Sequence, residues 1–504
     1  MGTGVMDQVR RWLLVRRLGG LLSGSYDDLQ RLVEKVHEGP PTGSMGLESL
    51  LRAMRRDIAS RSGLAALFVR LGRQLSPRAK RRLLGNLIYN WAVVGARRRF
   101  ALQQGGQWVP SFIVISPTMR CNLSCTGCYA GLYQRQGELS EAEISRLLDE
   151  CRSIGANFVV VSGGEPYLLK DMWLRLFRRY DDMFFMTYTN GTLLDERTVE
   201  ALARLGNVAP ALSVEGYREP TDRRRGHGVY DKVEAATRRL RDHGVLFGVS
   251  ITYTSENVVE VTRDEFVQHW LERGAIFAWY FMFMPVGKDP VLELVPTPQQ
   301  RLECGRRVED MRRRLPIFLA DFWNDGPASA GCLAGGRLYL HVVNSGRVEP
   351  CVFAHFGVDN IRDKTLVEAA NSPFFQALRR EFPYNENANL RRPCMIVDNP
   401  QVLRKVVAEH MVPAGHQHSE DVVRDPAVVA WVDRYARSLQ ELTDPIWEAQ
   451  IRDPADRWYR EGAEYKNLFR FRPRRDEGAA ARGAAAATAT ADARAAADEK
   501  LPVA

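Results

Sequence analysis

The sequence predicts an α/β fold: a partial (β/α)6 barrel with an amino-terminal helical region before it and a smaller α+β region after it. Between about residues 110 and 290, six apolar runs that mostly lack polar alternation are separated by helical stretches. Such runs are typical of parallel strands buried on both faces, with helices covering the sheet. Six units are too few to close an eight-stranded barrel, so we expect a partial one.

Each expected element is a short continuous segment. The six expected strands are FIVISP (112–117), NFVVVS (157–162), MFFMTYTN (183–190), APALSVEG (209–216), LFGVSITYT (246–254) and IFAWYFMFMP (276–285). The expected helices between them cover 140–153, 195–206, 230–244 and 262–274. The first helix opens with a capping box at Ser140 and Glu143, which satisfies backbone donors of its first turn.

The rest of the chain differs from the barrel segment in composition. A helical pattern at 297–314 and a hairpin-like segment around the turn Asn344-Ser345-Gly346 predict the α+β region. From residue 476 the chain is rich in Ala and has no large apolar residue before Leu501, which predicts disorder. The expected domains are a basic helical region (1–108), the partial barrel (109–295), the α+β region (296–396), a helical extension (397–474) and a disordered Ala-rich tail (475–504).

The composition excludes a membrane-spanning chain and indicates a reducing compartment. No run approaches the roughly 18 consecutive apolar residues of a membrane span. Arg10, Arg11, Arg16 and Arg17 interrupt the apolar residues that a signal peptide would need. Eight cysteines are spread over 504 residues, so we expect core or ligand thiols rather than a disulfide framework. The expected location is therefore the cytoplasm.

Positive charge is concentrated at the amino-terminal end. The net charge is +9, and residues 1–110 alone hold nineteen Lys and Arg against seven Asp and Glu. Helical segments there mix arginines with Leu, Val and Trp, as amphipathic helices at a membrane surface do. We therefore expect a peripheral contact of residues 1–100 with an anionic membrane, at the inner membrane face. The alternatives are a helical cap on the next domain and an RNA-binding surface, although little there suggests aromatic stacking on bases.

Three cysteines follow the first expected strand. They are Cys121, Cys125 and Cys128 in the segment CNLSCTGC. A structural zinc ion requires four protein ligands, whereas a four-iron, four-sulfur cluster held by three thiolates keeps one iron open for another ligand. The triplet favours the cluster, and a zinc site that recruits a distant fourth ligand is the alternative.

Polar groups also end the next three expected strands. GGEP (163–166) follows the second strand, TNGT (189–192) the third and SVEG (213–216) the fourth. Two glycines let a backbone approach a ligand closely, and Glu165 can accept from an ammonium group. Each segment alone is typical of an ordinary turn. Because the carboxyl ends of parallel strands meet at one edge, we expect these groups beside the cysteine loop.

This combination resembles the radical S-adenosylmethionine family. The triplet CNLSCTGC and the GGEP segment one strand later carry the resemblance over about residues 110–290. It implies that the three cysteines hold a [4Fe-4S] cluster whose open iron takes the amine and carboxylate of S-adenosylmethionine. It also implies cofactor contacts from Gly163, Gly164, Glu165 and Pro166 at the methionine ammonium, Ser213 and Glu215 at the ribose or methionine, and Asn190 and Tyr129 in the same pocket.

The chain departs from the family pattern at one position. Members usually carry an aromatic residue just before the last cysteine, against the adenine, whereas here Gly127 stands there and Tyr129 follows the cysteine. The implied chemistry is cleavage of S-adenosylmethionine to methionine and a 5′-deoxyadenosyl radical, which abstracts hydrogen from a C–H bond. The implied electron donor is a protein such as a flavodoxin or ferredoxin.

The α+β region holds three further cysteines. Cys332, Cys351 and Cys394 resemble the auxiliary-cluster extensions called SPASM and twitch domains. A dense cysteine series after Cys394 is missing, so the shorter twitch type fits better. The resemblance implies a second iron–sulfur cluster, with His355 as one candidate for its fourth ligand. A zinc knuckle and three unrelated thiols are the alternatives.

The sequence therefore predicts a radical S-adenosylmethionine enzyme, an oxidoreductase or transferase of unassigned reaction. The basic amino-terminal helices make a lipid or membrane-borne molecule the first choice of substrate. A peptide-modifying maturase is the main alternative, since auxiliary-cluster domains often accompany peptide modification in this family. A nucleic-acid-modifying enzyme and a non-catalytic metal-binding or cluster-binding protein are the remaining alternatives.

Overall fold

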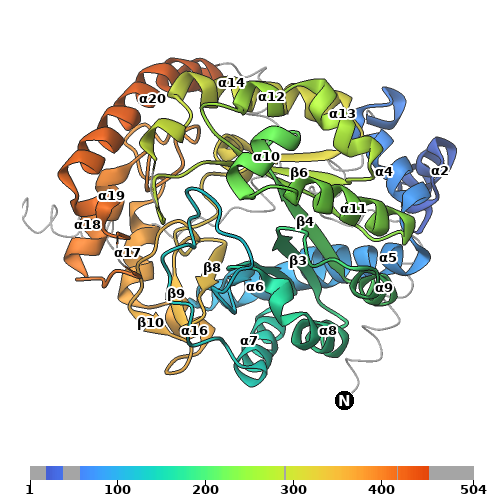
Figure 1. Cartoon of the computed structure of the whole chain (residues 1–504), viewed down its shortest axis with the longest axis horizontal. Helices are drawn as coiled ribbons and strands as arrows, with labels where there is room; N and C mark the ends of the chain where they lie inside the picture. Colours follow the sequence, from blue (N-terminus) through green and yellow to red (C-terminus); the bar gives the residue numbers. More distant parts are fainter. Residues whose placement is uncertain (1–18, 38–56, 289–290, 417, 453–504) are drawn as a thin grey trace, which may run out of the picture.

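The computed structural model describes residues 19–37, 57–288, 291–416 and 418–452. Figure 1 shows a central sheet with helices around it, the amino-terminal helices α2 and α4 on one side and the carboxyl-terminal helices on the opposite side. The expected Ala-rich tail and the end of the expected helical extension lie outside the described residues.

A ten-stranded sheet forms the centre of the molecule, in the order β10-β9-β8-β1-β2-β3-β4-β5-β6-β7. The neighbours from β8 to β7 are all parallel, and β9 pairs antiparallel with both β8 and β10. The strands are β1 (Phe112–Ile115), β2 (Phe158–Val161), β3 (Phe184–Thr189), β4 (Val208–Val214), β5 (Gly248–Tyr253), β6 (Phe277–Met282), β7 (Phe318–Asp321), β8 (Tyr339–Val342), β9 (Arg347–Glu349) and β10 (Asp359–Asn360). Because β1 to β6 follow one another in chain order, the sheet winds as a barrel does.

Helices connect the barrel strands, and the predicted partial (β/α)6 barrel is confirmed. The four expected helices are α7 (Glu141–Ile154), α9 (Glu196–Leu205), α11 (Val229–Asp242) and α13 (Asp264–Glu272). Four further helical segments were not predicted: η3 (Pro166–Leu169), α8 (Lys170–Arg179), α10 (Arg218–Arg225) and α12 (Val258–Val261). The segment of α8 contains no long apolar run, and the helix buries only Trp173, Leu176 and Phe177.

The smaller α+β region continues the same sheet across residue 295. It adds β7 beside β6 and β8 beside β1, both in parallel. The hairpin β8–β9 turns at Asn344-Ser345-Gly346 as expected, with a φ of 84° at Gly346 that suits glycine. The helices of this region are η4 (Leu292–Leu294), α14 (Pro298–Arg314), α15 (Gly326–Ser329), α16 (Leu366–Ala370) and α17 (Pro373–Glu381).

The described amino-terminal helices pack on the sheet. They are η1 (Gly19–Leu22), α2 (Tyr26–His37), α4 (Gly63–Gln74), α5 (Pro77–Arg82), the π-helix η2 (Leu83–Gly95) and α6 (Ala96–Gln104). Their leucines and valines form one buried cluster with Phe184, Ala209 and Phe277, which lie at or near the starts of three strands. Many of the described apolar side chains that suggested a membrane surface are thus buried against the sheet, as in a helical cap, whereas Leu64, Ile88, Val94 and Phe100 are exposed. Residues 1–18 and 38–56 of the basic region lie outside the described residues. Among the described helices, none has the length and apolar character that a membrane crossing requires.

The carboxyl-terminal helices lie beside the α+β region (Figure 1). They are α18 (Pro400–Glu409), α19 (Asp421–Arg424) and α20 (Pro426–Arg452). A fully buried ion pair joins the loop before α18 to α14: Arg301 Nη2 lies 3.0 Å from Asp398 Oδ2. Arg301 also donates to the carbonyl of Trp323 at 3.1 Å. These bonds fix the position of Cys394, which lies in the same loop.

Candidate active site

The cysteine loop (residues 117–131) begins two residues after the end of β1, at the carboxyl edge of the barrel strands. Cys121, Cys125 and Cys128 are free thiols of intermediate burial. Burial raises the pKa of Cys121 to about 11, and the other two thiols add to the rise. The three expected cluster ligands lie within eight consecutive residues of this one loop.

Asn190, at the end of β3, lies against this loop. Its Nδ2 is 3.8 Å from Cys121 Sγ and donates to Asn122 Oδ1 at 2.9 Å. The Leu123 N–H approaches Cys121 Sγ at 3.4 Å. Hydrogen bonds to a cysteine sulfur favour its thiolate form and tune the potential of a cluster bound there.

Gly163 and Gly164 hold the start of the cysteine loop at close range. Gly164 N–H donates to the Thr118 carbonyl at 2.9 Å, and Glu165 N–H donates to the Arg120 carbonyl at 2.8 Å. A Cβ on Gly164 would lie 2.0 Å from the Arg120 carbonyl oxygen, and one on Gly163 would lie 2.4 Å from the Thr118 oxygen. Only glycine fits at both positions. The close approach that these glycines permit is thus the approach of β2 to the cysteine loop.

Glu165 is a buried carboxylate between β2 and β3. Its Oε1 accepts from the Tyr167 N–H (3.0 Å) and the Thr189 hydroxyl (2.8 Å), and its Oε2 accepts from the Asn190 N–H (2.8 Å). Burial raises its pKa to about 7 despite these hydrogen bonds. The three donors are neutral, so a bound ammonium group would favour the ionised carboxylate. The next residue, Pro166, is buried and opens η3.

Glu215, which directly follows β4, is engaged by two arginines of α10. Arg224 Nη1 and Arg225 Nη2 both lie 2.6 Å from its Oε1, and Arg225 Nε lies 2.6 Å from its Oε2. Burial acts to raise the pKa of Glu215, but the charges of Arg225 and Arg224 outweigh it and hold the pKa below its usual range. Arg224 Nε also donates to the Thr126 carbonyl at 3.1 Å, which ties Glu215 to the cysteine loop. Ser213 lies two residues earlier and is half-buried.

An aromatic ring from another strand lies beside Gly127. A Cβ at Gly127 would lie 2.4 Å from the ring of Phe283, and its φ of 61° also favours glycine. Phe283 directly follows β6 and is buried. An aromatic ring thus lies beside Gly127 in space, although residue 127 itself carries none, and it comes from Phe283, 156 residues downstream, which no local pattern indicated.

Tyr129 points from the cysteine loop toward the α+β region. Its hydroxyl is 2.9 Å from Ser162 Oγ, and its ring centroid is 5.3 Å from that of Phe353. Burial raises its pKa to about 12. Because Phe353 lines the cavity that contains Cys332, Cys351 and Cys394, the Tyr129 ring lies between that cavity and the cysteine loop.

Cys332, Cys351 and Cys394 line one cavity, so the fold also brings these three residues together. The cavity is small, about 20 Å³, and opens partly to solvent. Burial raises the pKa of Cys332 to about 12, and the nearby Cys351 thiol adds to the rise. The other residues that line the cavity are Phe322, Trp323, Ala334, Phe353, Pro393, Met395 and Ile396.

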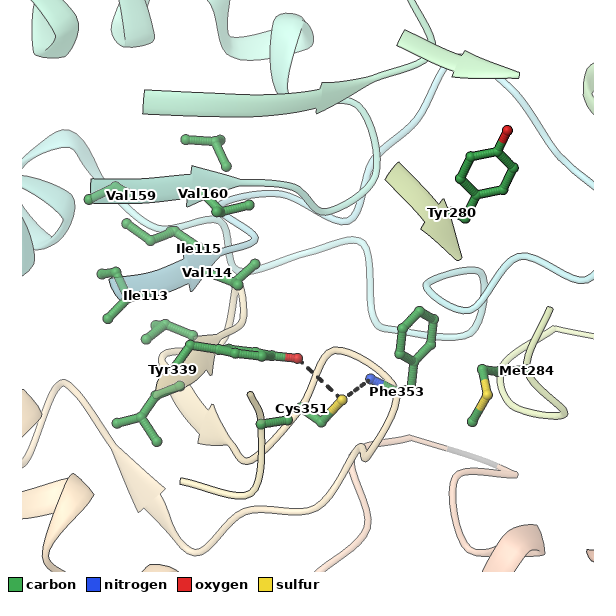
Figure 2. Packing of buried hydrophobic residues seen from close by; sticks show 14 of the residues in the cluster. Ile113, Val114, Ile115, Val159, Val160, Tyr280, Met284, Tyr339, Cys351 and Phe353 are labelled. Atoms are coloured by element: carbon green, nitrogen blue, oxygen red, sulfur yellow. Dashed lines mark hydrogen bonds between the residues drawn. The ribbon is translucent and has the colours of Figure 1, made fainter. Parts of the chain in front are cut away.

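Hydrogen bonds position the second set of sulfurs. The Tyr339 hydroxyl donates to Cys351 Sγ at 3.3 Å, and the Phe353 N–H approaches the same sulfur at 3.4 Å (Figure 2). The Cys394 N–H donates to Asp398 Oδ2 at 2.9 Å, so the buried ion pair of Asp398 anchors this cysteine.

His355 does not line this cavity. Its Nδ1 is 2.8 Å from His416 Nε2, and its Nε2 is 2.9 Å from the Val352 carbonyl oxygen. Both ring nitrogens are thus engaged, which removes His355 as a candidate fourth ligand. Within the described ranges, no three His, Cys, Asp or Glu side chains are arranged to hold a metal ion. The thiolates of a four-iron cluster differ from the ligands of a single ion in that each binds a different iron.

A buried polar chain that the sequence analysis missed connects the two regions. Ser116 Oγ, just after β1, is 2.8 Å from His341 Nε2, and His341 Nδ1 is 3.1 Å from Glu349 Oε2. The Tyr133 hydroxyl donates to the same Glu349 oxygen at 2.7 Å. These bonds join the end of the cysteine loop to the hairpin that leads to Cys351.

Most of the barrel segment matches the model of a known protein family. Residues 115–265 match the model of the Radical SAM superfamily. This segment contains the cysteine loop, Gly163 to Glu165 and Glu215, all at the carboxyl edge of the sheet. Residues 115–265 therefore form a Radical SAM domain, as the resemblance implied.

Two curated relatives carry different names. Fe-coproporphyrin III synthase of Methanosarcina barkeri is 33% identical over 227 residues, which cover 43% of this chain and 56% of that protein. PqqA peptide cyclase of Gluconobacter oxydans is 29% identical over 286 residues, which cover 54% of this chain and 79% of that protein. The chain thus spans little more than half the length of the first relative.

Among solved structures, Streptococcus suis SuiB bound to S-adenosylmethionine aligns with a TM-score of 0.48 and 19% identity. The alignment covers 56% of this chain and 71% of that chain.

Proposed function

We propose that this protein is an enzyme that cleaves S-adenosylmethionine at a [4Fe-4S] cluster held by Cys121, Cys125 and Cys128. The observation that carries the proposal is that one loop holds three thiols and lies against the buried carboxylate of Glu165, within the segment that matches the Radical SAM superfamily. When bound, the cluster supplies one electron to the cofactor, and the 5′-deoxyadenosyl radical that results abstracts hydrogen from the substrate.

The residues around the loop bind and orient the cofactor. Glu165 accepts from the methionine amino group, because it is a buried carboxylate whose present donors are neutral. Gly163 and Gly164 act by holding the loop in place. Arg224 and Arg225 keep Glu215 ionised beside the loop, and the ring of Phe283 packs against the adenine in place of a side chain at residue 127.

We further propose a second iron–sulfur cluster at Cys332, Cys351 and Cys394. Three thiols converge on one cavity whose other walls are mainly aromatic and aliphatic side chains. Such walls exclude water and control the potential of a buried cluster. A small electron-transfer protein such as a flavodoxin or ferredoxin would reduce the first cluster.

For the substrate we propose a peptide. The PqqA peptide cyclase supports this class, since the similarity covers 79% of that protein, against 56% of the porphyrin-named relative. The lipid interpretation relied on the basic amino-terminal helices, and many apolar side chains of the described helices pack against the sheet instead.

Cofactor cleavage can be tested on anaerobically reconstituted protein. We expect about eight irons per chain and formation of 5′-deoxyadenosine with dithionite and S-adenosylmethionine. Cys125→Ala should keep about four irons and form no nucleoside, whereas Cys351→Ala should still form it. Nucleoside formation by Cys125→Ala at the rate of the unchanged protein would refute the assignment of the loop.

The substrate class can be tested through the abstracted hydrogen. The protein would be incubated with the peptide, lipid or porphyrin fraction of cells grown in deuterated water. We expect deuterium in 5′-deoxyadenosine only with the peptide fraction, because hydrogen moves from substrate to the nucleoside. Deuterium with the lipid or the porphyrin fraction alone would replace the peptide proposal by that class.

A further inference from the structure

One face of the strands β3 to β6 is only partly buried. On the opposite face Phe185 packs on Phe177 of α8, and the Tyr280 hydroxyl donates to the Val261 carbonyl of α12. That face is therefore the outer one, which helices cover in a barrel. The half-buried residues of these four strands all belong to the inner face, because side chains alternate along a strand. They are Met186, Tyr188, Ser213, Thr252, Trp279 and Phe281.

The strand register leads across this inner face from the cofactor residues to aromatic side chains. Ser213 of β4, which we expect at the cofactor, is level with Ser250 of β5, and Ser250 is level with Trp279 of β6. Thr252 and Phe281 form the next pair toward the carboxyl edge. Since neighbouring strands lie about 4.8 Å apart, Trp279 and Ser213 are roughly 10 Å apart across the sheet. Only short side chains stand on β5 between them.

The amino-terminal helices cover the part of this face that lies nearer the strand starts. Met186, Tyr188 and Trp279 pack against the buried cluster of those helices. The pair Thr252 and Phe281 lies further along the strands, on the side of the cysteine loop. A substrate that meets the cofactor would therefore contact this end of the face.

Phe281 joins aromatic rings from three strands. Its ring centroid is 5.6 Å from that of Tyr188 on β3, in an edge-to-face arrangement. It is also 5.5 Å from the centroid of Phe322, which directly follows β7. Phe322 lines the cavity of the proposed second cluster. Phe281 thus lies between the cofactor edge of the barrel and that cavity.

The inner face of β3 to β7 carries no charged side chain, and all its residues are among those described. Glu215, which follows β4, is already paired with Arg224 and Arg225. An ionised side chain bound at this face would lose its hydration without gaining a partner. An aromatic ring would instead continue the edge-to-face packing of Tyr188 and Phe281, which is favourable beyond the burial of apolar area.

We infer that the reacting group of the substrate is an uncharged aromatic side chain that binds on this inner face against Phe281 and Tyr188. The inference rests on the peptide substrate of the proposed function. The C–H bond next to the ring breaks, its hydrogen atom joins the 5′ carbon of the deoxyadenosyl radical, and the unpaired electron stays on the substrate carbon. The ring stabilises that carbon radical by delocalisation. The short side chains of Ser213, Ser250 and Thr252 leave the space through which the C–H bond faces the cofactor.

The test uses the reconstituted full-length protein and peptide fractions of cells supplied with one class of side-chain-deuterated amino acid. The three classes are the aromatic amino acids, leucine and lysine. Mass spectrometry measures the fraction of 5′-deoxyadenosine that carries deuterium. We expect deuterium only with the aromatic label, because the abstracted hydrogen moves from the substrate to the nucleoside.

Phe281→Leu tests the binding residue itself. It keeps an apolar side chain but removes the ring, so the deuterated fraction of the nucleoside with the aromatic label should fall about tenfold. Phe318→Leu is the matched control, because Phe318 is on the same face but at the start of β7, level with Phe277, and is 47% exposed. It should leave the deuterated fraction unchanged.

The outcomes separate the aromatic assignment from the peptide proposal. Deuterium from the leucine or the lysine label alone would overturn the aromatic side chain and leave a peptide as substrate. An unchanged deuterated fraction in Phe281→Leu would overturn the role of Phe281, and the labels decide the substrate group even if this variant fails to fold. If none of the three labels transferred deuterium, the aromatic assignment would also fall. Peptides from cells grown in deuterated water would then show whether the peptide class falls with it.

Discussion

The two cysteine sites differ in how their thiols are surrounded. Cys121, Cys125 and Cys128 lie on a partly exposed loop, and polar or charged groups from several strand ends meet there. Cys351 and Cys394 are buried, and the cavity that they share with Cys332 has mainly apolar walls. One site is open and polar, and the other is enclosed and apolar.

This difference matches the two roles that we propose. A cofactor that is cleaved in each turnover must enter and leave, so its site needs an accessible side and polar groups that recognise it. A cluster that only transfers electrons or holds a substrate stays in place, and an apolar shell protects it and sets its potential. The edge-to-face pair of Tyr129 and Phe353 is a direct aromatic contact between the two sites.

The two sites also depend on different buried carboxylates, and this leads to the largest expected effect. Asp398→Asn removes the charge that compensates Arg301, and both side chains are completely buried. Loss of one partner of such a pair leaves an unpaired buried charge, which should lower the free energy of unfolding by about 3–5 kcal/mol. Chemical denaturation of the apoprotein measures this loss.

Asp433→Asn is the control for Asp398. Its ion pair with Arg404 has a similar N–O distance of 2.6 Å, but the two side chains are 33% and 23% exposed. We expect a loss of about 0–1 kcal/mol there, because solvent screens the pair. Equal losses in the two variants would show that the buried pair does not hold the second site together.

At the first site, Glu215→Gln should have a smaller effect of about 2–3 kcal/mol. Glu215 is only 2% exposed, but its partners Arg224 and Arg225 are 15% and 11% exposed and can regain some hydration. Since Arg224 also holds the Thr126 carbonyl, the variant should lose iron from the cysteine loop faster. Denaturation and the rate of iron release to a chelator measure the two effects.

Glu219→Gln provides the comparison on the same helix. Glu219 pairs with Arg223 at 3.1 Å on the surface, with its side chain 75% exposed, so its loss should change neither stability nor iron release measurably. If both variants released iron at the same rate, the assignment of Glu215 as an anchor of the loop would fail.

The barrel and the two sets of cysteines could be predicted from local sequence. Apolar runs without alternation identify buried parallel strands, and polar residues at their ends fall at one edge of the sheet because parallel strands share a direction. The same reasoning placed Asn190 and Glu165 beside the cysteine loop, where they are found. These inferences need only the pattern of apolar and polar residues along the chain and the direction of the strands.

The missed features depend on contacts between distant segments. Phe283 approaches Gly127 from β6, and Ser116 meets His341 across more than 200 residues, so no local pattern contains either pair. The two arginines that engage Glu215 follow it within ten residues, but only the turn into α10 aims them back at it. The amino-terminal helices have the composition of membrane-surface helices, and only the sheet that they cover shows where their apolar faces go.

The smallest expected effect is a pH dependence that separates the sites further. Glu165 has a pKa near 7 in the folded protein, because burial disfavours its ionised form. Its unfolded pKa is near 4, so the folded apoprotein binds more protons than the unfolded chain between about pH 4 and 7. The contribution of Glu165 to the free energy of unfolding therefore falls as the pH rises through that window. Glu165→Gln cannot ionise, so the difference in unfolding free energy between the two proteins should change by about 2 kcal/mol from pH 5 to pH 8.

Denaturation of both proteins at the two pH values tests this expectation. A difference that is the same at both pH values would mean that Glu165 is already ionised at pH 5 and that its three hydrogen bonds outweigh its burial. A change of the expected sign would show that burial keeps Glu165 protonated at pH 5 in the folded apoprotein, so that a bound positive charge would favour its ionised form. S-adenosylmethionine should then reduce the pH dependence of the reconstituted protein, because a bound amino group favours the ionised carboxylate in the folded state.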